Sequence, residues 1–307
     1  MIYWNVTGAI GDEVGQKIFS EKVSAPYSAV FIFNESYFGL CPQVGRNESP
    51  QIIDLVAHKE KIARDLNLPT APNSVAVPEQ FDGILVLDLE TWSPWYRLTP
   101  EPMKQIARNL IRKKYPIALP NWLVERGAES QFNRAAIAFF TATIEAIRKA
   151  RPRAQIGFYG FPFTWNYPNH AEYGIPFNDF MRPIYEQLDV LLPSIYMLYP
   201  TGYTEGNWTC TEADQKYLVD NNLNEARRVR DTLRMDHEII PYCWYRYHDV
   251  TGIPQAGQLM SAEDLSFHLK YPLEAGDIKH CVLWGWENVG LEAEKFRDYA
   301  ETIKSVV

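Results

Sequence analysis

Seven short segments rich in apolar and β-branched residues recur along the chain, and this recurrence constrains the fold more than any other feature. Several are nearly continuous apolar runs, which is typical of parallel strands that are covered on both faces. In chain order they are IYWNV (2–6), AVFIF (29–33), GILVLDLE (83–90), QIGFYGF (155–161), VLLPSIYM (190–197), EIIPYCWYRY (238–247) and CVLWGW (281–286).

Helical patterns occupy most of the intervening stretches. Thr99, followed by Pro100 and Glu101, predicts a helix start, and apolar residues at helical spacing continue to a basic end at residues 112–114. A second pattern covers residues 132–147, and Ser261 with Asp264 predicts the start of a late helix. Alternating strands and helices over 307 residues predict a single α/β domain spanning 1–307. We expect an incomplete (β/α) barrel of the TIM type with about seven parallel strands, or failing that a doubly wound sheet.

Charge and hydropathy exclude some classes of partner. The net charge of -8 and the pI of about 5.4 argue against general affinity for nucleic acid or anionic membranes, which attract clustered Lys and Arg. A polyanionic substrate would need a local basic patch. No uninterrupted apolar segment approaches the roughly 18 to 20 residues of a membrane span, so we expect a soluble protein. The first residues, MIYWNVTGAIGDEVG, lack the basic start and apolar region of a secretory signal.

Motifs for cofactors, metals and nucleophilic serines are missing from the sequence. There is no GxSxG, no Walker motif, no HExxH and no correctly spaced GxGxxG after the first strand. The four cysteines, at positions 41, 210, 243 and 281, show no zinc-ligand spacing. We therefore expect no cofactor and no metal, and we expect Cys243 and Cys281, which lie in apolar runs, to be buried free thiols.

Two carboxylates close the third apolar segment. Asp88 and Glu90 are two residues apart, so in a strand their side chains project to the same side. In a parallel barrel, the reacting groups lie at the carboxyl ends of the strands, which is where these two acids fall. Aromatic residues end other strands, at Tyr159, Tyr196, Tyr245 and Trp284. The convergence of these strand ends favours a catalytic site over a solvated loop.

Paired acids among aromatic rings are typical of glycoside hydrolysis. Neighbouring acids on one strand suit a substrate-assisted reaction, in which the 2-acetamido oxygen of the sugar attacks its own anomeric carbon. Glu90 would donate the proton and Asp88 would stabilise the charged ring. Two nearby carboxylates also raise the pKa of one of them, which keeps a proton available for donation.

At these residues the sequence resembles the hyaluronidases of the bee-venom and mammalian type, glycoside hydrolase family 56. The matching segments, in order, are IYWNV, DLETWSPWYR, GFYGFPFTWN, DVLLPSIYM, PYCWYRYHD and LWG. The resemblance implies a distorted seven-stranded barrel that cuts β-1,4 bonds of hyaluronan as an endo-acting enzyme. It also implies Glu90 as general acid and base, Asp88 and Tyr196 as partners of the acetamido group, Tyr159 as a further hydrogen-bonding group, and Trp284 as a wall of the acetyl pocket.

Two alternatives stay open, a chondroitin hydrolase of the same family and a catalytically silent glycan-binding barrel. For a glycosaminoglycan substrate we expect a locally basic groove, with Arg97 and Arg246 as candidates to bind its carboxylates. The family resemblance implies secretion. However, Gly11, Ala293 and Thr164 stand where the family carries cysteines, which weakens the inference of an oxidising setting.

Overall fold

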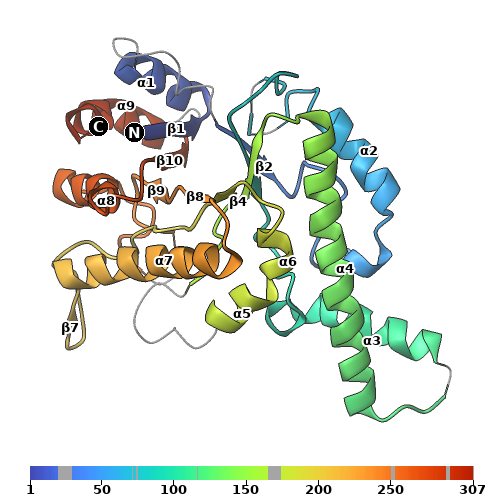
Figure 1. Cartoon of the computed structure of the whole chain (residues 1–307). Coiled ribbons are helices and arrows are strands. Elements are labelled where there is room, and N and C mark those ends of the chain that lie inside the picture. The colour runs from blue at the N-terminus through green and yellow to red at the C-terminus, as the bar shows by residue number, and fades with distance from the viewer. Residues whose placement is uncertain are drawn as a thin grey trace.

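The computed structural model describes residues 1–19, 30–70, 72–73, 75–115, 117–164, 174–249, 253–287 and 291–306. It is an α/β structure in which parallel strands lie at the centre and helices pack around them (Figure 1). The strands are β1 (Ile2–Thr7), β2 (Val30–Asn34), β3 (Ile84–Asp88), β4 (Gln155–Phe158), β5 (Val190–Leu191), β8 (Glu238–Ile239), β9 (Tyr242–Trp244), β10 (Cys281–Trp286) and the hairpin β6 (Thr204–Glu205) and β7 (Trp208–Thr209).

Helices connect most of these strands. They are α1 (Ala9–Phe19), α2 (Leu55–Asp65), α3 (Glu101–Lys114), α4 (Asn121–Ala150), α5 (Gly174–Phe180), α6 (Arg182–Tyr185), α7 (Glu212–Leu233), α8 (Ala262–Glu274) and α9 (Leu291–Val306), with 3-10 turns η1 (Pro50–Ile52) and η2 (Tyr96–Leu98). In the described part of the chain, no helix is long and apolar enough to cross a membrane.

The parallel strands form three hydrogen-bonded groups, ordered β2-β3-β4, β5-β8 and β1-β10-β9. Single bridges join the groups, from Tyr159 to Leu192 and from Ser194 to Tyr242. Between β1 and β2 no ladder is formed within the described residues, but Asn5 Nδ2 donates to the Val30 carbonyl over 3.4 Å. The prediction of parallel strands in an α/β fold is confirmed.

Prolines make two of the strands shorter than the sequence suggested. The segment 190–197 is a strand only at Val190–Leu191, and the segment 238–247 is divided between β8 and β9. Pro193 and Pro241 lie at these interruptions and have no N–H to donate to a ladder. A backbone hydrogen bond still joins the two interrupted segments, because Tyr242 N–H donates to the Pro193 carbonyl over 2.9 Å.

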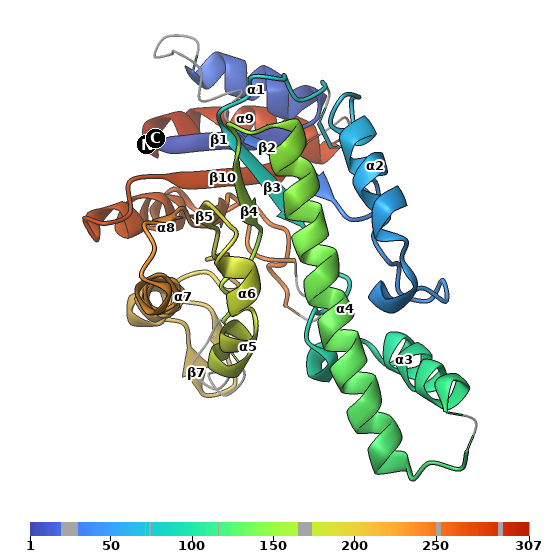
Figure 2. The same ribbon diagram turned by 45° about the vertical axis from the view of Figure 1, so that its right-hand side comes forward.

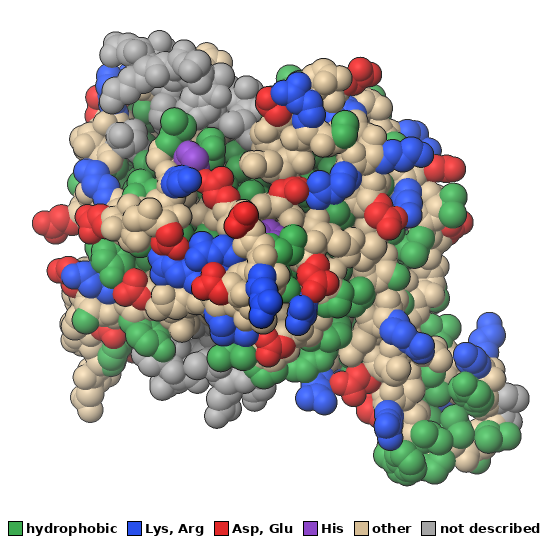
Figure 3. All heavy atoms as spheres, in the orientation of Figure 1, with side chains coloured by type: hydrophobic (Ala, Val, Ile, Leu, Met, Phe, Trp, Pro, Cys, Tyr) green, Lys and Arg blue, Asp and Glu red, His purple; other side chains and the backbone are tan. Residues whose placement is uncertain are grey.

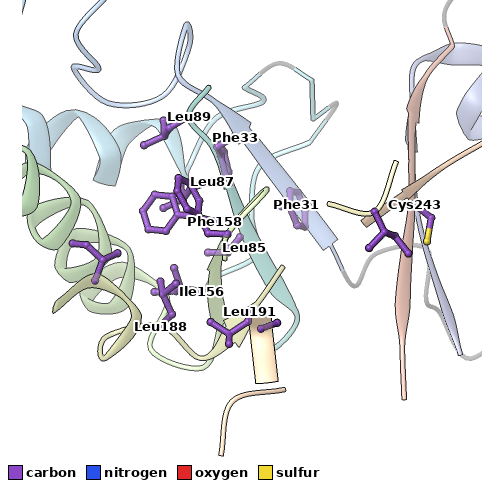
Figure 4. Close-up of a cluster of buried hydrophobic side chains, with 14 of the residues drawn as sticks. Phe31, Phe33, Leu85, Leu87, Leu89, Ile156, Phe158, Leu188, Leu191 and Cys243 are labelled. Atoms are coloured by element: carbon purple, nitrogen blue, oxygen red, sulfur yellow. The ribbon is translucent and has the colours of Figure 1, made fainter. Parts of the chain in front are cut away.

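Strand residues alternate between two buried clusters. Leu85, Leu87 and Phe158 point outward and pack against the helices, and Figure 4 shows them gathered with their neighbours on one side of the strands. Val86 and Ile84 point the other way, into an inner cluster with residues from β2, β5, β9 and β10. Helix α4 lies against strands β3 and β4 in Figure 2 and covers the outer cluster. The centre of its Phe140 ring lies 4.8 Å from that of the Phe158 ring. Both faces of β3 are therefore buried, as its continuous apolar sequence predicts.

The two helix starts predicted from the sequence, at Thr99 and Ser261, are correct within one residue. Ser261 is the N-cap of α8 and its hydroxyl accepts a hydrogen bond from Asp264 N–H at 3.0 Å, as predicted. The N-cap of α3 is Pro100, whereas Thr99 was expected. The Thr99 hydroxyl instead donates to the Ser93 carbonyl at 2.5 Å, so it ties down the loop that follows β3.

The four cysteines are buried free thiols, which confirms the prediction for Cys243 and Cys281. Gly11 leaves no room for a side chain, because an added Cβ would lie 2.9 Å from the Val6 carbonyl oxygen. Thr164 is buried and its hydroxyl bonds to the Asn222 side chain. At two of the positions where the family resemblance predicts cysteines, this chain thus has a tightly packed Gly11 and a hydrogen-bonded Thr164.

Candidate active site

The two acids lie together on the inner side of β3. Side chains at 84, 86, 88 and 90 share one face, and the first two belong to the inner cluster. The same cavity is lined by Asp88 and Glu90 together, as predicted from their spacing. The chain after Glu90 is anchored by Trp92, whose buried ring packs edge-on against Phe132 and Phe140 of α4.

The neighbouring strand β2 orients Asp88. Asn34 is paired with Asp88 in the parallel register, and Asn34 Nδ2 donates to Asp88 Oδ2 over 3.2 Å. The Asn34 side-chain oxygen accepts from Ser36 N–H at 2.9 Å, which directs its amino group toward the acid. Burial raises the pKa of Asp88, and the Asn34 hydrogen bond opposes part of this shift. Sequence reasoning did not assign a role to Asn34.

Glu90 is the more strongly perturbed acid. Its side chain is open to the cavities around it, but dense protein surroundings remove much of the water that would solvate its charge. This desolvation, reinforced by the negative charge of Asp88, raises the pKa of Glu90 to about 8. Glu90 therefore holds a proton at neutral pH, and that is the property of a general acid.

A third carboxylate lies behind the pair. Glu35 follows β2, is buried, and accepts a hydrogen bond from Thr91 N–H at 2.9 Å. Burial raises its pKa, and the charge of Asp88 adds to this effect. Glu35 and Glu90 interact electrostatically, so a negative Glu35 also favours the protonated form of Glu90. The sequence could have predicted a place for Glu35 near the site, because this residue lies just beyond the end of a strand.

Four aromatic rings form a wall beside the acids. The centre of the Tyr196 ring lies 5.7 Å from those of Tyr159 and Trp244 and 6.0 Å from that of Trp284, with which it is stacked. The Tyr159 hydroxyl donates to Ser194 Oγ at 3.3 Å. The structure thus brings the predicted residues Tyr159, Tyr196 and Trp284 together with Asp88 and Glu90.

Trp244 occupies the place that sequence reasoning gave to Tyr245. Trp244 shares the inner face with Tyr242, and its Cα is paired with that of Trp284 in the register of β9 and β10. Tyr245 points outward, where its ring centre lies 4.5 Å from that of Phe296 and its hydroxyl donates to Glu287 at 2.7 Å. The expectation for Tyr245 was wrong by one residue, which in a strand reverses the face.

Two cavities meet at Glu90. The smaller, of about 140 Å³, is lined by Asp88, Tyr196, the two tryptophans and Asp249, and the larger, of about 440 Å³, extends past Phe161, Phe163 and Ser194. Three residues line both cavities: Glu90, Tyr159 and His248. Burial lowers the pKa of His248, so its imidazole is neutral at pH 7. Glu90 therefore lies at the junction of the two cavities.

Arg246 does not reach this site. Its guanidinium is buried and donates to Glu287 Oε1 at 2.7 and 3.0 Å and to the Gly257 carbonyl at 2.9 Å. The Glu287 backbone carbonyl in turn accepts from the N–H groups of Ile10 and Gly11 at the start of α1. Arg246 and Glu287 thus join the end of β10 to α1 and to the segment after β9, and we assign Arg246 no contact with substrate.

Arg97 lies on η2 and is exposed. It pairs with Glu129 of α4 at 3.0 Å, and its guanidinium lies 5.3 Å from the centre of the Trp95 ring. The adjacent Leu98 lines the larger cavity, so Arg97 remains a candidate at the rim of the site. The expected basic groove is not seen in the described lining of either cavity, which contains carboxylates but no Lys or Arg.

Two neighbouring carboxyl groups beside a wall of aromatic rings at the ends of parallel strands are an arrangement typical of glycoside hydrolases. A profile of the hyaluronidase family, glycoside hydrolase family 56, matches residues 15–303. The chain belongs to this family, and the resemblance found in the sequence is confirmed.

Relatives with this name are found in several animals. A hyaluronidase of Apis mellifera is 26% identical over 331 residues, which cover 97% of this chain and 80% of the relative. Hyaluronidase-1 of Sus scrofa is 29% identical over 262 residues, covering 82% of this chain and 57% of the relative. A salivary hyaluronidase of Lutzomyia longipalpis is 27% identical over 256 residues, covering 77% of this chain and 62% of the relative.

Solved structures share the fold. The crystal structure of bee venom hyaluronidase matches with a TM-score of 0.79 and 24% identity, over 99% of both chains. A second structure of bee venom hyaluronidase, in complex with a hyaluronic acid tetramer, matches with a TM-score of 0.77 and 23% identity, over 99% of this chain and 98% of the other.

Replacing Arg246 should reduce stability and leave substrate affinity unchanged. Arg246→Met removes the charged partner of the buried Glu287 carboxylate and leaves it the Tyr245 hydroxyl, and breaking a buried ion pair typically costs about 3–5 kcal/mol of the free energy of unfolding. Arg97→Met is the matched control for stability alone, because its exposed ion pair should contribute less than about 1 kcal/mol. Urea unfolding and KM of the folded enzyme test both. If Arg246→Met had normal stability and a raised KM, Arg246 would contact the substrate, contrary to this prediction.

Proposed function

We propose that this chain is an endo-acting glycoside hydrolase that cleaves the β-1,4 bonds of hyaluronan by a substrate-assisted, retaining reaction. The single observation that carries the proposal is the position of Glu90, protonated at neutral pH and lying where two cavities meet beside Asp88. Membership of the hyaluronidase family supports the choice of substrate.

In the first step, Glu90 gives its proton to the glycosidic oxygen while the bond between that oxygen and the anomeric carbon breaks. The carbonyl oxygen of the 2-acetamido group forms the new bond to the anomeric carbon, which produces an oxazolinium ring. Asp88 accepts a hydrogen bond from the acetamido N–H and so balances the positive charge. Asn34 keeps Asp88 in the required orientation through the 3.2 Å hydrogen bond.

In the second step, the Glu90 carboxylate takes a proton from water as the water oxygen attacks the anomeric carbon and the ring opens. Two displacements at the same carbon return the original configuration. Glu90 regains its proton, so the enzyme is ready for another cycle. No covalent bond to the protein forms at any stage.

The two cavities have different roles in this proposal. The smaller one would hold the sugar that carries the acetamido group, with Tyr196 as a hydrogen-bonding partner and the rings of Trp244 and Trp284 against its apolar surface. The larger one would hold the departing part of the chain. Tyr159 and His248 line both cavities, so both can contact the sugars on either side of the cleaved bond.

We infer that the strands form a distorted barrel of about seven strands, with β8 and β9 counted as one interrupted strand. The bridges between strand groups and the hydrogen bond from Asn5 to Val30 support this closure. We also infer that the protein acts outside the cell, because a salivary hyaluronidase is among its relatives and extracellular hyaluronan would be its substrate.

Glu90→Gln should lower kcat by about 10²- to 10⁴-fold, because an amide cannot donate the proton that general acid catalysis needs. Asp88→Asn should also be severely impaired. Thr91→Ser, which changes the next residue while keeping its hydroxyl, is the control and should retain activity. Release of reducing ends from hyaluronan, with chondroitin and buffer run in parallel, measures these effects and separates a chondroitin hydrolase from a silent glycan-binding barrel. More than a tenth of wild-type kcat in Glu90→Gln would overturn the assignment.

The first product should keep the β configuration at its new reducing end. NMR of the anomeric proton in the first minutes of reaction would report it before mutarotation. A thiazoline mimic of the intermediate should bind more tightly than the product that ends in N-acetylglucosamine, because the site is complementary to the transition state. An inverted anomer, or a sugar attached to a side chain in mass spectra of a trapped reaction, would contradict the mechanism.

A further inference from the structure

The hairpin of α3 and α4 carries exposed apolar side chains at its tip. Ile117 is 71% exposed and Trp122 is 66% exposed, and Tyr115 and Leu123 are exposed beside them. Figure 3 shows hydrophobic side chains gathered at this end of the molecule, at the lower right of the view. We call the exposed residues among 112–115 and 117–126 the α3–α4 tip. Large apolar side chains clustered on a projection are unusual on a soluble surface and mark an interaction site.

Packing below the tip holds it in place. Ile111 and Val124 are buried between the two helices, and an added Cβ at Gly127 would lie 3.2 Å from the Ile111 side chain. The helices therefore approach closely at this glycine. The four exposed side chains are displayed from an ordered base and are not left over from a loosely packed end.

The tip is also strongly basic. Arg112, Lys113 and Lys114 end α3 and are exposed, and Arg126 is exposed one turn beyond Trp122. Residues 112–126 contain four basic residues and one acidic residue, Glu125, in a protein whose net charge is -8. The positive charge is thus local to the same end that carries the apolar side chains.

We propose that the α3–α4 tip docks the enzyme on the surface of an anionic lipid bilayer. Trp and Tyr favour the interface between headgroups and acyl chains, and aliphatic side chains can enter the outer part of the acyl region. Lys and Arg beside them are attracted to anionic headgroups. The contact is peripheral and requires no membrane-spanning segment.

Two other occupants fit the tip less well. A polysaccharide chain would use the aromatic rings and the basic groups, but would leave Ile117 and Leu123 exposed to water. A second copy of this chain, or another protein, would need an interface of about 20–30 residues on each side, whereas the tip is narrow and convex. A bilayer accommodates a convex apolar tip without a matching groove.

The tip lies at the same end of the molecule as the active site. Helix α4 has 30 residues and so is about 45 Å long, far longer than the four-residue strand β4 that follows it. Because β4 runs back in the opposite direction, the first turn of α4 lies at the end of the molecule where the strands terminate. Figures 1 and 2 both show the α3–α4 tip projecting beyond the other elements. Docking would direct the active-site end toward the membrane.

Co-sedimentation with phosphatidylcholine vesicles, with and without 30% phosphatidylserine, tests the proposal. The wild-type protein should bind the anionic vesicles, and raised salt should weaken the binding. The paired substitution Ile117→Ser with Trp122→Ser, and the paired substitution Lys113→Glu with Lys114→Glu, should each lower the partition coefficient at least tenfold. Val56→Ser and Leu68→Ser remove equally exposed apolar side chains from another surface and should have no effect.

Melting temperature and hydrolysis of soluble hyaluronan should be the same in all variants, because none of the tip residues that the structure describes lines either cavity at Glu90. This separates failure of the docking proposal from failure of the proposed function. Absence of binding to anionic vesicles, or equal binding by the wild type and both tip variants, would overturn the proposal. Tip-dependent retention on immobilised hyaluronan without vesicle binding would assign the tip to the polysaccharide, and tip-dependent dimerisation in light scattering would assign it to a second copy.

Discussion

The desolvation of two neighbouring carboxyl groups, Asp88 at the end of β3 and Glu90 just beyond it, is the constraint on which the rest of the site depends. Taking a carboxylate out of water is unfavourable, and a second negative charge beside it adds to the cost. The lower-energy state retains one proton. Desolvation places that proton on Glu90, while Asn34 stabilises the charge of Asp88. The two acids thus differ in protonation because their surroundings differ.

The fold maintains this arrangement from both sides of the strand. On the outer side, Leu87 belongs to the core cluster that α4 covers, and Trp92 packs against Phe140 of α4, so the backbone is held on either side of the acids. On the inner side, β2 supplies Asn34, and the ends of the other strands supply the aromatic wall. A free energy cost at the site is thereby offset by hydrophobic burial in the surrounding core, a compromise between stability and activity that is common in enzymes.

The periodicity of the sequence was enough to predict parallel strands, the shared face of Asp88 and Glu90, and the strand ends that carry Tyr159 and Tyr196. It could not fix the face of every residue, because a shift of one position exchanges Trp244 with Tyr245. The alternation that begins at Tyr242 was the available signal for Trp244, since both belong to the inner side.

Interactions between distant segments were beyond the reach of the sequence. Arg246 and Glu287 are 41 residues apart, so their buried ion pair depends on the way β10 and the segment after β9 come together. The resemblance to the hyaluronidase family supplied the chemistry that periodicity alone left open. It did not indicate that Asn34 would orient Asp88, because that contact depends on the register between β2 and β3.

The most direct test of the account is the difference in the free energy of unfolding between Glu90→Gln and the wild type, measured by urea denaturation from pH 4 to 9. Desolvation by the surrounding protein, reinforced by the charge of Asp88, raises the pKa of Glu90 from its usual 4.5 to about 8 in the folded protein. Between these two pH values, Glu90 is ionised in the unfolded chain but protonated in the folded one. The free energy of unfolding of the wild type should therefore fall relative to that of the variant as pH rises, and the difference should level off above about pH 8. A difference that does not change with pH would mean that folding leaves the pKa of Glu90 unaltered, and would contradict the proposal that Glu90 is the proton donor.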